Sequence, residues 1–257
     1  MIFLIGGAGF VGSGFARTLA ELGRPHVVLQ RHNYRDYAGQ RCDILINANG
    51  NSRKLLARQA PLEDFDQSVR SVRASLEDFQ YGLYLHLSSC DVYPDCSSPS
   101  LTTEDLPLDP AAQSPYGFHK SLAELCVRHA APNWLIFRCG GFVGPNMKKN
   151  AIFDILQGGP LWLDPDSELQ FLHTSAAARI ALALAERGVR NEVFNLCGNG
   201  VVKLRDVAEA AGKHVTVTPG SPRVRYDVSI AKLARHIDVP DTRRAVLDFV
   251  RGSLTRP

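Results

Sequence analysis

The sequence has little that would direct the chain to a membrane or to nucleic acid. Its formal net charge is +3 over 257 residues, which is too small to indicate a polyanionic partner. No apolar stretch is long enough to span a bilayer. The apolar N-terminus lacks the basic segment of a signal peptide and leads directly into a glycine-rich turn, so we interpret it as a first strand. We therefore expect a cytoplasmic protein that acts on a small molecule, with no nucleic-acid or membrane partner.

The cysteines lack the spacing of a metal site or of a redox pair. None of the six belongs to a CxxC motif or to a cysteine–histidine cluster. Most lie within apolar runs, as Cys139 does at the end of Ile136-Phe137-Arg138-Cys139. This placement is typical of small buried hydrophobic residues in a reducing compartment. The sequence therefore predicts no metal site.

Three glycines follow the first apolar run. Ile2 to Ile5 predicts a buried parallel strand, and a helical pattern begins soon after Gly12. A strand, a glycine-rich turn and a helix form the context of a dinucleotide-binding fingerprint, whose helix start offers N–H groups to a pyrophosphate. The alternative is a turn that only serves a tight strand–helix crossing. Candidate cofactor contacts in this segment are Gly6, Gly9, Phe10, Val11 and Gly12.

The second predicted strand, His26 to Leu29, bears on the choice of cofactor. It ends in Gln30-Arg31-His32, and the first carboxylate after it is Asp36. In dinucleotide folds an acidic residue at this position binds the ribose of NAD, whereas an arginine suits the 2′-phosphate of NADP. Gln30 and Arg31 are therefore candidate cofactor contacts that favour NADP over NAD. The alternative is an arginine on a solvated loop.

A third apolar strand, Cys42 to Asn47, follows after a short connection. The connection predicts that the usual intervening helix is missing or reduced. Asn47, Ala48 and Asn49 then stand at the carboxyl end of this strand, where doubly wound sheets bind ligands. We assign these three residues to cofactor binding.

The rest of the chain continues the alternation of strands and helices. We expect helices over residues 61–80, from 116 onward, 175–186, 204–212, 228–237 and 242–250, and strands over 84–89, 134–138 and 192–196. This alternation predicts an α/β fold, with a doubly wound parallel (Rossmann) sheet and a small C-terminal substrate-capping region. We place the dinucleotide-binding domain at 1–144, joined by segments from about 169–198, and the smaller region at 145–257.

Tyr116 and Lys120 are one helical turn apart at the start of a predicted helix, so both side chains lie on one face. Alone, such a pair could be an ordinary feature of a helix surface. It follows the glycine turn and the strand end at Ser88-Ser89 in chain order, and the three together are far more specific.

These segments resemble the extended short-chain dehydrogenases/reductases, and within them the NAD-dependent epimerase/dehydratase family of nucleotide-sugar enzymes. The resemblance covers most of the chain. It rests on Gly6 to Gly12, Ser88 to Tyr93, Tyr116 to Lys120, Glu104, Pro110, Arg138, Gly144-Pro145, Phe171 to His173 and Phe194 to Leu196.

The resemblance implies hydride transfer at a sugar carbon, at C4 by reduction or epimerisation. Tyr116 would be the acid/base, Lys120 would lower its pKa and hold the nicotinamide ribose, and Ser89 would orient the substrate oxygen. Lowering a tyrosine pKa from about 10 to about 7 requires roughly 4 kcal/mol in favour of the phenolate. Gly141 and Val143, after the strand at 134–138, complete the cofactor contacts that we assign.

The sequence departs from the family pattern in three places, one of which is Thr174-Ser175, where the family has an acidic residue after the histidine. Members that dehydrate sugars carry Asp-Glu where this chain has Cys90-Asp91, which argues against dehydration. The arginine that usually binds the nucleotide is replaced within Glu168-Leu169-Gln170, so the diphosphate needs another partner. Candidate substrate contacts are Asp91, Asn150, Arg223 and Arg225.

Two other functions remain open. One is a reductase of the same fold that acts on a carbonyl compound without a nucleotide. The other is a non-catalytic Rossmann-fold sensor or scaffold, against which the retained Tyr116 and Lys120 argue. The resemblance also implies a homodimer formed through the helices at 61–80 and 116–129.

Overall fold

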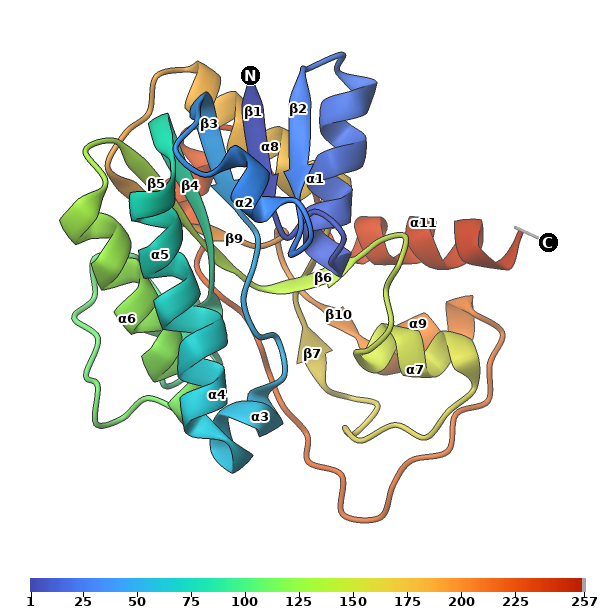
Figure 1. The fold of residues 1–257 in the computed structure, drawn as a ribbon. Helices are drawn as coiled ribbons and strands as arrows, with labels where there is room; N and C mark the ends of the chain where they lie inside the picture. Colours follow the sequence, from blue (N-terminus) through green and yellow to red (C-terminus); the bar gives the residue numbers. More distant parts are fainter. Residues whose placement is uncertain (256–257) are drawn as a thin grey trace.

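The computed structural model describes residues 1–255, and a six-stranded parallel sheet forms its centre (Figure 1). The strand order is β2 (His26–Leu29), β1 (Ile2–Ile5), β3 (Arg41–Asn47), β4 (Gln80–Ser89), β5 (Trp134–Cys139) and β9 (Glu192–Leu196). Every neighbouring pair is parallel. The chain turns one way from β1 to β2 and the other way to β3, so a ligand crevice is expected at the carboxyl ends of β1 and β3. The predicted fold class is confirmed.

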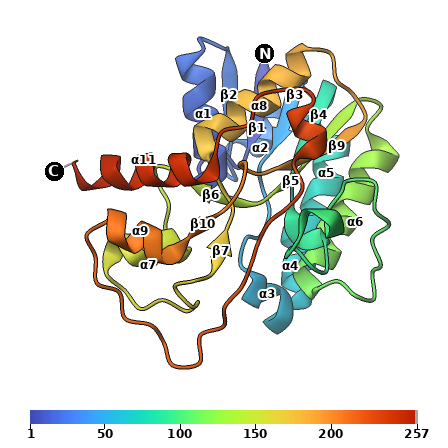
Figure 2. The ribbon, with the colours of Figure 1, turned by 180° about the vertical axis from the view of Figure 1, so that it is seen from behind.

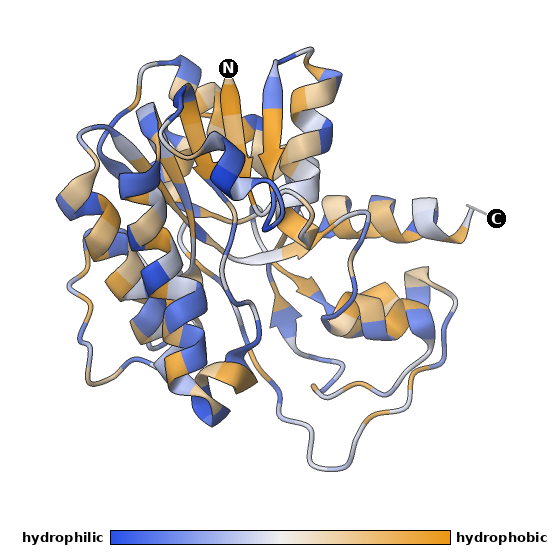
Figure 3. Cartoon of the chain, in the orientation of Figure 1, coloured by the Kyte–Doolittle hydropathy of each residue, from blue (hydrophilic) through white to orange (hydrophobic). Residues whose placement is uncertain are grey.

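Helices cover both faces of this sheet (Figures 1 and 2). One face carries α1 (Phe10–Glu21) and α8 (Thr174–Glu186), and the other carries α5 (Ser71–Asp78) and α6 (Pro115–Ala130). Each layer has its own apolar core, with Phe15 and Leu19 in the first and Val72 and Val127 in the second. Apolar residues concentrate on the central strands, whereas the helices carry a mixture of polar and apolar residues (Figure 3). Burial of the strands on both faces explains their nearly continuous apolar sequences.

The connection between β2 and β3 contains a reduced helix, as predicted. This helix is α2 (Tyr34–Tyr37), a single turn of four residues. The Tyr34 hydroxyl donates a hydrogen bond of 2.9 Å to Asp78 at the end of α5. A short α2 therefore still covers the edge of the second core.

The helix predicted over 61–80 is interrupted and ends two residues early. A π-helical turn, η1 (Asp66–Arg70), separates α4 (Pro61–Phe65) from α5. At the C-terminal end, Phe79 is already extended and Gln80 pairs with Arg41 as the first residue of β4. The prediction failed there because helical periodicity does not report where a sheet partner begins.

A smaller region lies beside the carboxyl edge of the sheet (Figure 1). Two small sheets, a helical cluster and long loops form it. They comprise β6 (Gly141–Val143) with β8 (Phe171–His173), β7 (Glu168–Leu169) with β10 (Val202–Lys203), and α7 (Ala151–Gln157), α9 (Leu204–Ala210) and α11 (Thr242–Leu254). A third apolar core, with Ile152 and Val246 at 0% exposure, joins these helices. No helix within residues 1–255 is long and apolar enough to cross a membrane.

Two predicted elements differ in this part of the chain. The helix expected over 228–237 shrinks to α10 (Ala231–Ala234). Val228 lies outside the helix, and its N–H donates to the Gln170 side chain at 2.9 Å instead of forming a helical hydrogen bond. The segment after β5, for which the sequence predicted no regular element, contains strand β6.

Candidate active site

The glycine turn after β1 has the geometry that a dinucleotide pyrophosphate needs. Gly6 has a φ of +79°, and a Cβ there would lie 2.8 Å from the backbone of Ala48 and Asn49. A Cβ on Gly12 would lie 2.2 Å from the Gly6 carbonyl oxygen, so α1 can approach β1 closely only without a side chain. Gly9 caps α1 without a side-chain hydrogen bond, which leaves N–H groups of the first turn for a ligand. The turn therefore fits a pyrophosphate.

The end of β2 places Arg31 beside this turn. Asn33 closes the following turn by accepting a 2.7 Å hydrogen bond from the Gln30 N–H and donating to the Val28 carbonyl. Arg31 is exposed, and no acidic side chain within residues 1–255 pairs with it. Its guanidinium therefore has no counter-charge in the part of the chain that the structure describes.

Asn47 shapes the end of β3 from a buried position. Its side chain donates to the Tyr84 hydroxyl at 2.7 Å and to Ser75 at 3.1 Å, and it accepts from the Asn49 N–H at 3.0 Å. All of its polar atoms thus have partners in the chain. Asn47 fixes the backbone of Ala48 and Asn49 against the glycine turn, and contacts to a cofactor there would come from those two residues.

Gly141 and Val143 lie in β6 beyond the end of β5. A Cβ on Gly141 would lie 2.6 Å from the Gln170 carbonyl oxygen. A glycine is therefore needed at this position for β6 to pack closely against the start of β8. The Val143 side chain is at 0% exposure in the core of the smaller region. Contacts of Val143 to a cofactor would therefore involve its backbone.

The start of α6 is fixed tightly against the end of β4. Ser114 caps the helix by accepting a 3.1 Å hydrogen bond from Gly117, and Pro115 occupies the first helical turn. A Cβ on Gly117 would lie 2.0 Å from the Asp91 carbonyl oxygen. The helix can therefore approach the turn that follows Ser89, which brings Tyr116 close to Ser89.

Ser89, Tyr116 and Lys120 come together in a nearly dry setting, with exposures of 7%, 8% and 5%. The Lys120 Nζ lies 5.5 Å from the centre of the Tyr116 ring. The Ser89 hydroxyl hydrogen-bonds the Asp91 carboxylate at 3.1 Å. The structure thus assembles the three predicted catalytic side chains from β4 and α6.

Burial is the largest influence on the pKa values of Tyr116 and Lys120. It raises the pKa of Tyr116, the nearby Asp91 carboxylate raises it further, and the Ser89 hydroxyl acts in the opposite direction. Burial also lowers the pKa of Lys120. The chain alone therefore keeps Tyr116 protonated, and a low tyrosine pKa would require an additional positive charge beside the ring.

His86 lies in β4 behind this group, and sequence reasoning did not find it. It is at 0% exposure, and neither ring nitrogen has a hydrogen-bond partner within residues 1–255. Burial, and then the charge of Lys120, lowers the pKa of His86 to about 3. A neutral imidazole therefore stands beside the Lys120 ammonium.

A buried ion pair supports the same face of α6. The Arg138 guanidinium donates to the Glu124 carboxylate at 2.9 and 3.1 Å, and the Ser88 hydroxyl donates to that carboxylate at 2.6 Å. Arg138 also reaches the Tyr93 hydroxyl at 2.8 Å. Sequence reasoning included Arg138 but missed Glu124, although Glu124 lies four residues after Lys120 on the same helical face.

A second polar cluster, also missed, links α6 to the π-helical turn. His119 Nδ1 lies 2.6 Å from the Asp64 carboxylate, which is at 0% exposure. Asn51 and Ser68 donate to the same carboxylate at 2.8 and 3.0 Å. The loop after β3 is thereby anchored to the helix that carries Tyr116 and Lys120.

The predicted substrate contacts lie at different depths. Asp91 forms an ion pair of 2.6 Å with Lys54. Asn150 caps α7 by accepting from Phe153 at 2.9 Å, so its side chain already has a structural task. Arg223 is exposed, whereas Arg225 pairs with two carboxylates, those of Glu168 and Asp227. The structure places Asp91 next to Ser89. Arg225 is not a free cation, because both of its carboxylate partners belong to the chain itself.

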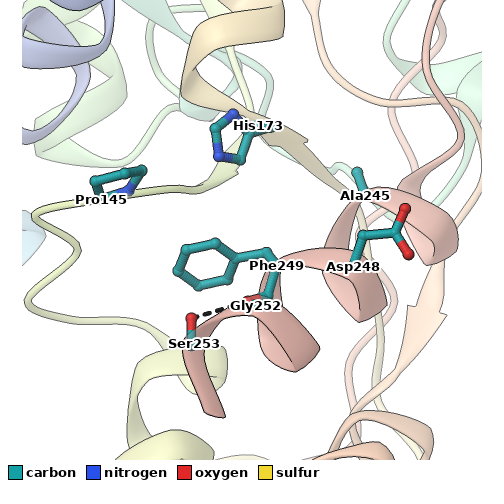
Figure 4. A pocket seen from close by; sticks show the side chains of 7 residues that line it. All are labelled: Pro145, His173, Ala245, Asp248, Phe249, Gly252 and Ser253. Carbon is teal, nitrogen blue, oxygen red and sulfur yellow. Dashed lines mark hydrogen bonds between the residues drawn. The ribbon is translucent and has the colours of Figure 1, made fainter. Parts of the chain in front are cut away.

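Two cavities occur in the smaller region. One of about 370 Å³ lies between α11 and the loop after β6, with His173 and Pro145 facing Phe249 (Figure 4). The other, of about 390 Å³, borders α9 near Arg205 and His214. Neither is lined by Ser89, Tyr116 or Lys120, so these cavities are separate from the candidate catalytic group.

Solved structures with this fold span nearly the whole chain. A UDP-galactose 4-epimerase superposes with a TM-score of 0.78 at 20% identity, covering 98% of each chain. RMD from Pseudomonas aeruginosa, complexed with NADPH, gives 0.75 at 23% identity, covering 97% of this chain and 99% of that one. A double mutant of DesIV, a dTDP-glucose 4,6-dehydratase from Streptomyces venezuelae with NAD bound, gives 0.79 at 20% identity, covering 100% and 97%.

At these identities the likeness establishes the fold. Among curated proteins, no relative matches the sequence. The model of the NAD dependent epimerase/dehydratase family, however, matches residues 2–197, which include the glycine turn, Ser89, Tyr116 and Lys120. This chain therefore belongs to the NAD dependent epimerase/dehydratase family.

Proposed function

We propose that the protein transfers hydride between a nicotinamide cofactor and a carbon of a nucleotide-linked sugar, at C4 by keto reduction or epimerisation. The observation that carries this proposal is the assembly of Ser89, Tyr116 and Lys120 at the carboxyl edge of a sheet whose glycine turn fits a pyrophosphate. When bound, the cofactor accepts or donates the hydride.

Each side chain has a separate task in this proposal. Tyr116 exchanges a proton with the substrate oxygen, and Ser89 holds that oxygen by a hydrogen bond. Lys120 supplies a fixed positive charge on the same helical face, 5.5 Å from the centre of the Tyr116 ring. Because burial raises the pKa of Tyr116, the phenolate would form only when a second positive charge stands beside it.

We propose NADP as the preferred cofactor, with NAD as the alternative. Arg31 supports this choice because it is exposed at the end of β2 and has no acidic partner within residues 1–255. The glycine turn would hold the pyrophosphate, and the backbone of Ala48 and Asn49 would border the same crevice.

The surroundings of Cys90 argue against dehydration. Its side chain is at 0% exposure, and its thiol donates to the Arg138 carbonyl at 3.1 Å. Burial also raises the pKa of this thiol. Cys90 therefore points into the protein and cannot serve as a proton donor to a sugar hydroxyl.

Tyr116→Phe tests the function. The variant should bind NADPH or NADH as the wild type does, because it lacks only the hydroxyl. Hydride transfer to 4-keto nucleotide sugars, followed at 340 nm, should fall at least about a hundredfold, since a positioned acid/base contributes roughly that much or more. Unchanged hydride transfer would refute the assigned role.

A second candidate is reduction of a carbonyl compound that carries no nucleotide. The pairing of Arg225 with Glu168 and Asp227 favours it, because this arginine is then less available to a diphosphate. Calorimetry with nucleoside diphosphates separates the two candidates, since binding would support the nucleotide-linked substrate.

We also propose a homodimer formed through α4–α5 and α6. Leu62 on α4 and Leu125 on α6 are exposed at 82% and 59%, which a partner helix pair would cover. A purely monomeric species in light scattering would contradict this arrangement.

A further inference from the structure

Two loops from distant parts of the chain meet near the candidate catalytic group, and both carry cations. The Lys149 ammonium, just before α7, donates to the Ser52 hydroxyl at 3.2 Å and to the Ser52 carbonyl oxygen. Ser52 is followed directly by Arg53 and Lys54, which lead into α3 (Lys54–Gln59). The contact joins the smaller region to the loop after β3.

These three cations have little negative charge to balance them. Lys54 pairs with Asp91 at 2.6 Å, but no acidic side chain within residues 1–255 pairs with Arg53 or Lys149. The pKa of Lys149 is lowered first by partial burial and then by the charges of Arg53 and Lys54. Gathering like charges in this way is unfavourable unless an anion joins them.

The loop that carries Arg53 is held in place. The Arg53 N–H donates to the Asn51 side chain at 2.7 Å, and Asn51 donates to the buried Asp64 at 2.8 Å. Asp64 in turn contacts His119 on α6 at 2.6 Å. The position of the cations is therefore tied to the helix of Tyr116, and such preorganisation favours binding.

The first of these cations, Lys54, lies close to the reacting end of the proposed site. Ser89 hydrogen-bonds one Asp91 oxygen at 3.1 Å, and Lys54 binds the other at 2.6 Å. One carboxylate therefore separates the Ser89 hydroxyl from the first of the three cations. An anionic group next to a sugar held at Ser89 would lie within their reach.

We propose that Arg53, Lys54 and Lys149 form a cationic clasp that binds an oxyanion of the substrate close to its sugar. Guanidinium and ammonium groups suit such oxygens through charge-assisted hydrogen bonds. The oxyanion is either the diphosphate of the nucleotide or a carboxylate on the sugar. The clasp rests on the proposed function and supplies the cations that the paired Arg225 does not.

Calorimetry on the full-length chain tests the clasp with four probes: inorganic pyrophosphate, UDP, UDP-glucose and UDP-glucuronic acid. The variants are Arg53→Gln and Lys149→Gln, and the control is Arg41→Gln at the opposite end of β3, which changes the net charge equally. Each variant in the clasp should weaken about tenfold the binding of those probes that carry the recognised oxyanion, and the control should not. Wild-type affinity should also fall more steeply with salt than that of the variants.

The probes distinguish the two oxyanions. Weaker binding of pyrophosphate and UDP would identify the diphosphate, and a selective loss for UDP-glucuronic acid would identify a sugar carboxylate. A wild type that binds none of the four, or clasp variants that match Arg41→Gln, would overturn the clasp. Binding of NADPH and NADH, measured in the same samples, should not change in the variants. If neither cofactor binds while pyrophosphate does, the proposed function fails and the clasp stands.

Discussion

The neutral His86 makes the stability of the protein sensitive to acid in a way that a single substitution can isolate. Burial lowers the pKa of His86 to about 3 in the folded chain, whereas a histidine in an unfolded chain has a pKa near 6.5. As the pH falls through 6.5, the unfolded chain takes up a proton that the folded chain refuses. The stability present above pH 6.5 is therefore lost progressively down to about pH 3.

The size of the effect follows from the gap between the two pKa values. A pH of 5 lies about 1.5 units below the pKa of the unfolded histidine, so that histidine is protonated, whereas the folded one is still neutral. This difference lowers the free energy of unfolding by about 2 kcal/mol relative to neutral pH. His86→Leu removes the titrating group and keeps an apolar side chain of similar size. The variant should lose about 2 kcal/mol less than the wild type between pH 7.5 and pH 5.

Urea unfolding followed by circular dichroism at the two pH values measures this difference. The quantity to compare is the change in unfolding free energy between pH 7.5 and pH 5 in each protein, because His86→Leu can also change the stability at pH 7.5 through packing. His129→Leu, on the exposed end of α6, is the matched control and should keep the wild-type dependence on pH. Equal losses in the wild type and His86→Leu would refute the assignment of a buried neutral imidazole.

Three further perturbations test other contacts. Arg31→Ala should raise the Kd of NADPH about tenfold and leave that of NADH nearly unchanged in fluorescence titrations, if Arg31 binds the 2′-phosphate. Gly117→Ala should reduce hydride transfer more than it reduces NADPH binding, because a Cβ would lie 2.0 Å from the Asp91 carbonyl oxygen and displace Tyr116. Glu124→Gln should lower the free energy of unfolding by about 3 kcal/mol in urea titrations, because it leaves the Arg138 cation buried without a counter-charge.

Each of these expectations has a clear contrary result. Equal weakening of NADPH and NADH binding would mean that Arg31 does not read the 2′-phosphate. Full hydride transfer by Gly117→Ala would show that α6 can move without displacing Tyr116. A Glu124→Gln variant as stable as the wild type would mean that Arg138 finds other partners.

The sheet and the proximity of Ser89, Tyr116 and Lys120 could be predicted from the sequence because both depend on local patterns. Strand β1 and most of β5 are buried on both faces and therefore appear as nearly continuous apolar runs. Tyr116 and Lys120 are related by a fixed helical spacing. Patterns of this kind can be read without knowing what packs against them.

The supporting polar groups could not be predicted with the same ease. Asp64 and His119 are 55 residues apart and meet only because α4 packs on α6. Arg225 was expected to bind substrate, but the strand pairing that places Glu168 beside it is a property of the folded chain. Glu124 could have been found, because its spacing from Lys120 puts a charge on the buried face of the helix.

A crystal structure of the protein with NADPH bound would test the central claim most directly. The account predicts the pyrophosphate on the turn from Gly6 to Gly12 and the nicotinamide ring in contact with Tyr116, with Lys120 at the adjoining ribose. A nicotinamide ring far from Tyr116, or a protein that takes up neither NADPH nor NADH, would contradict it.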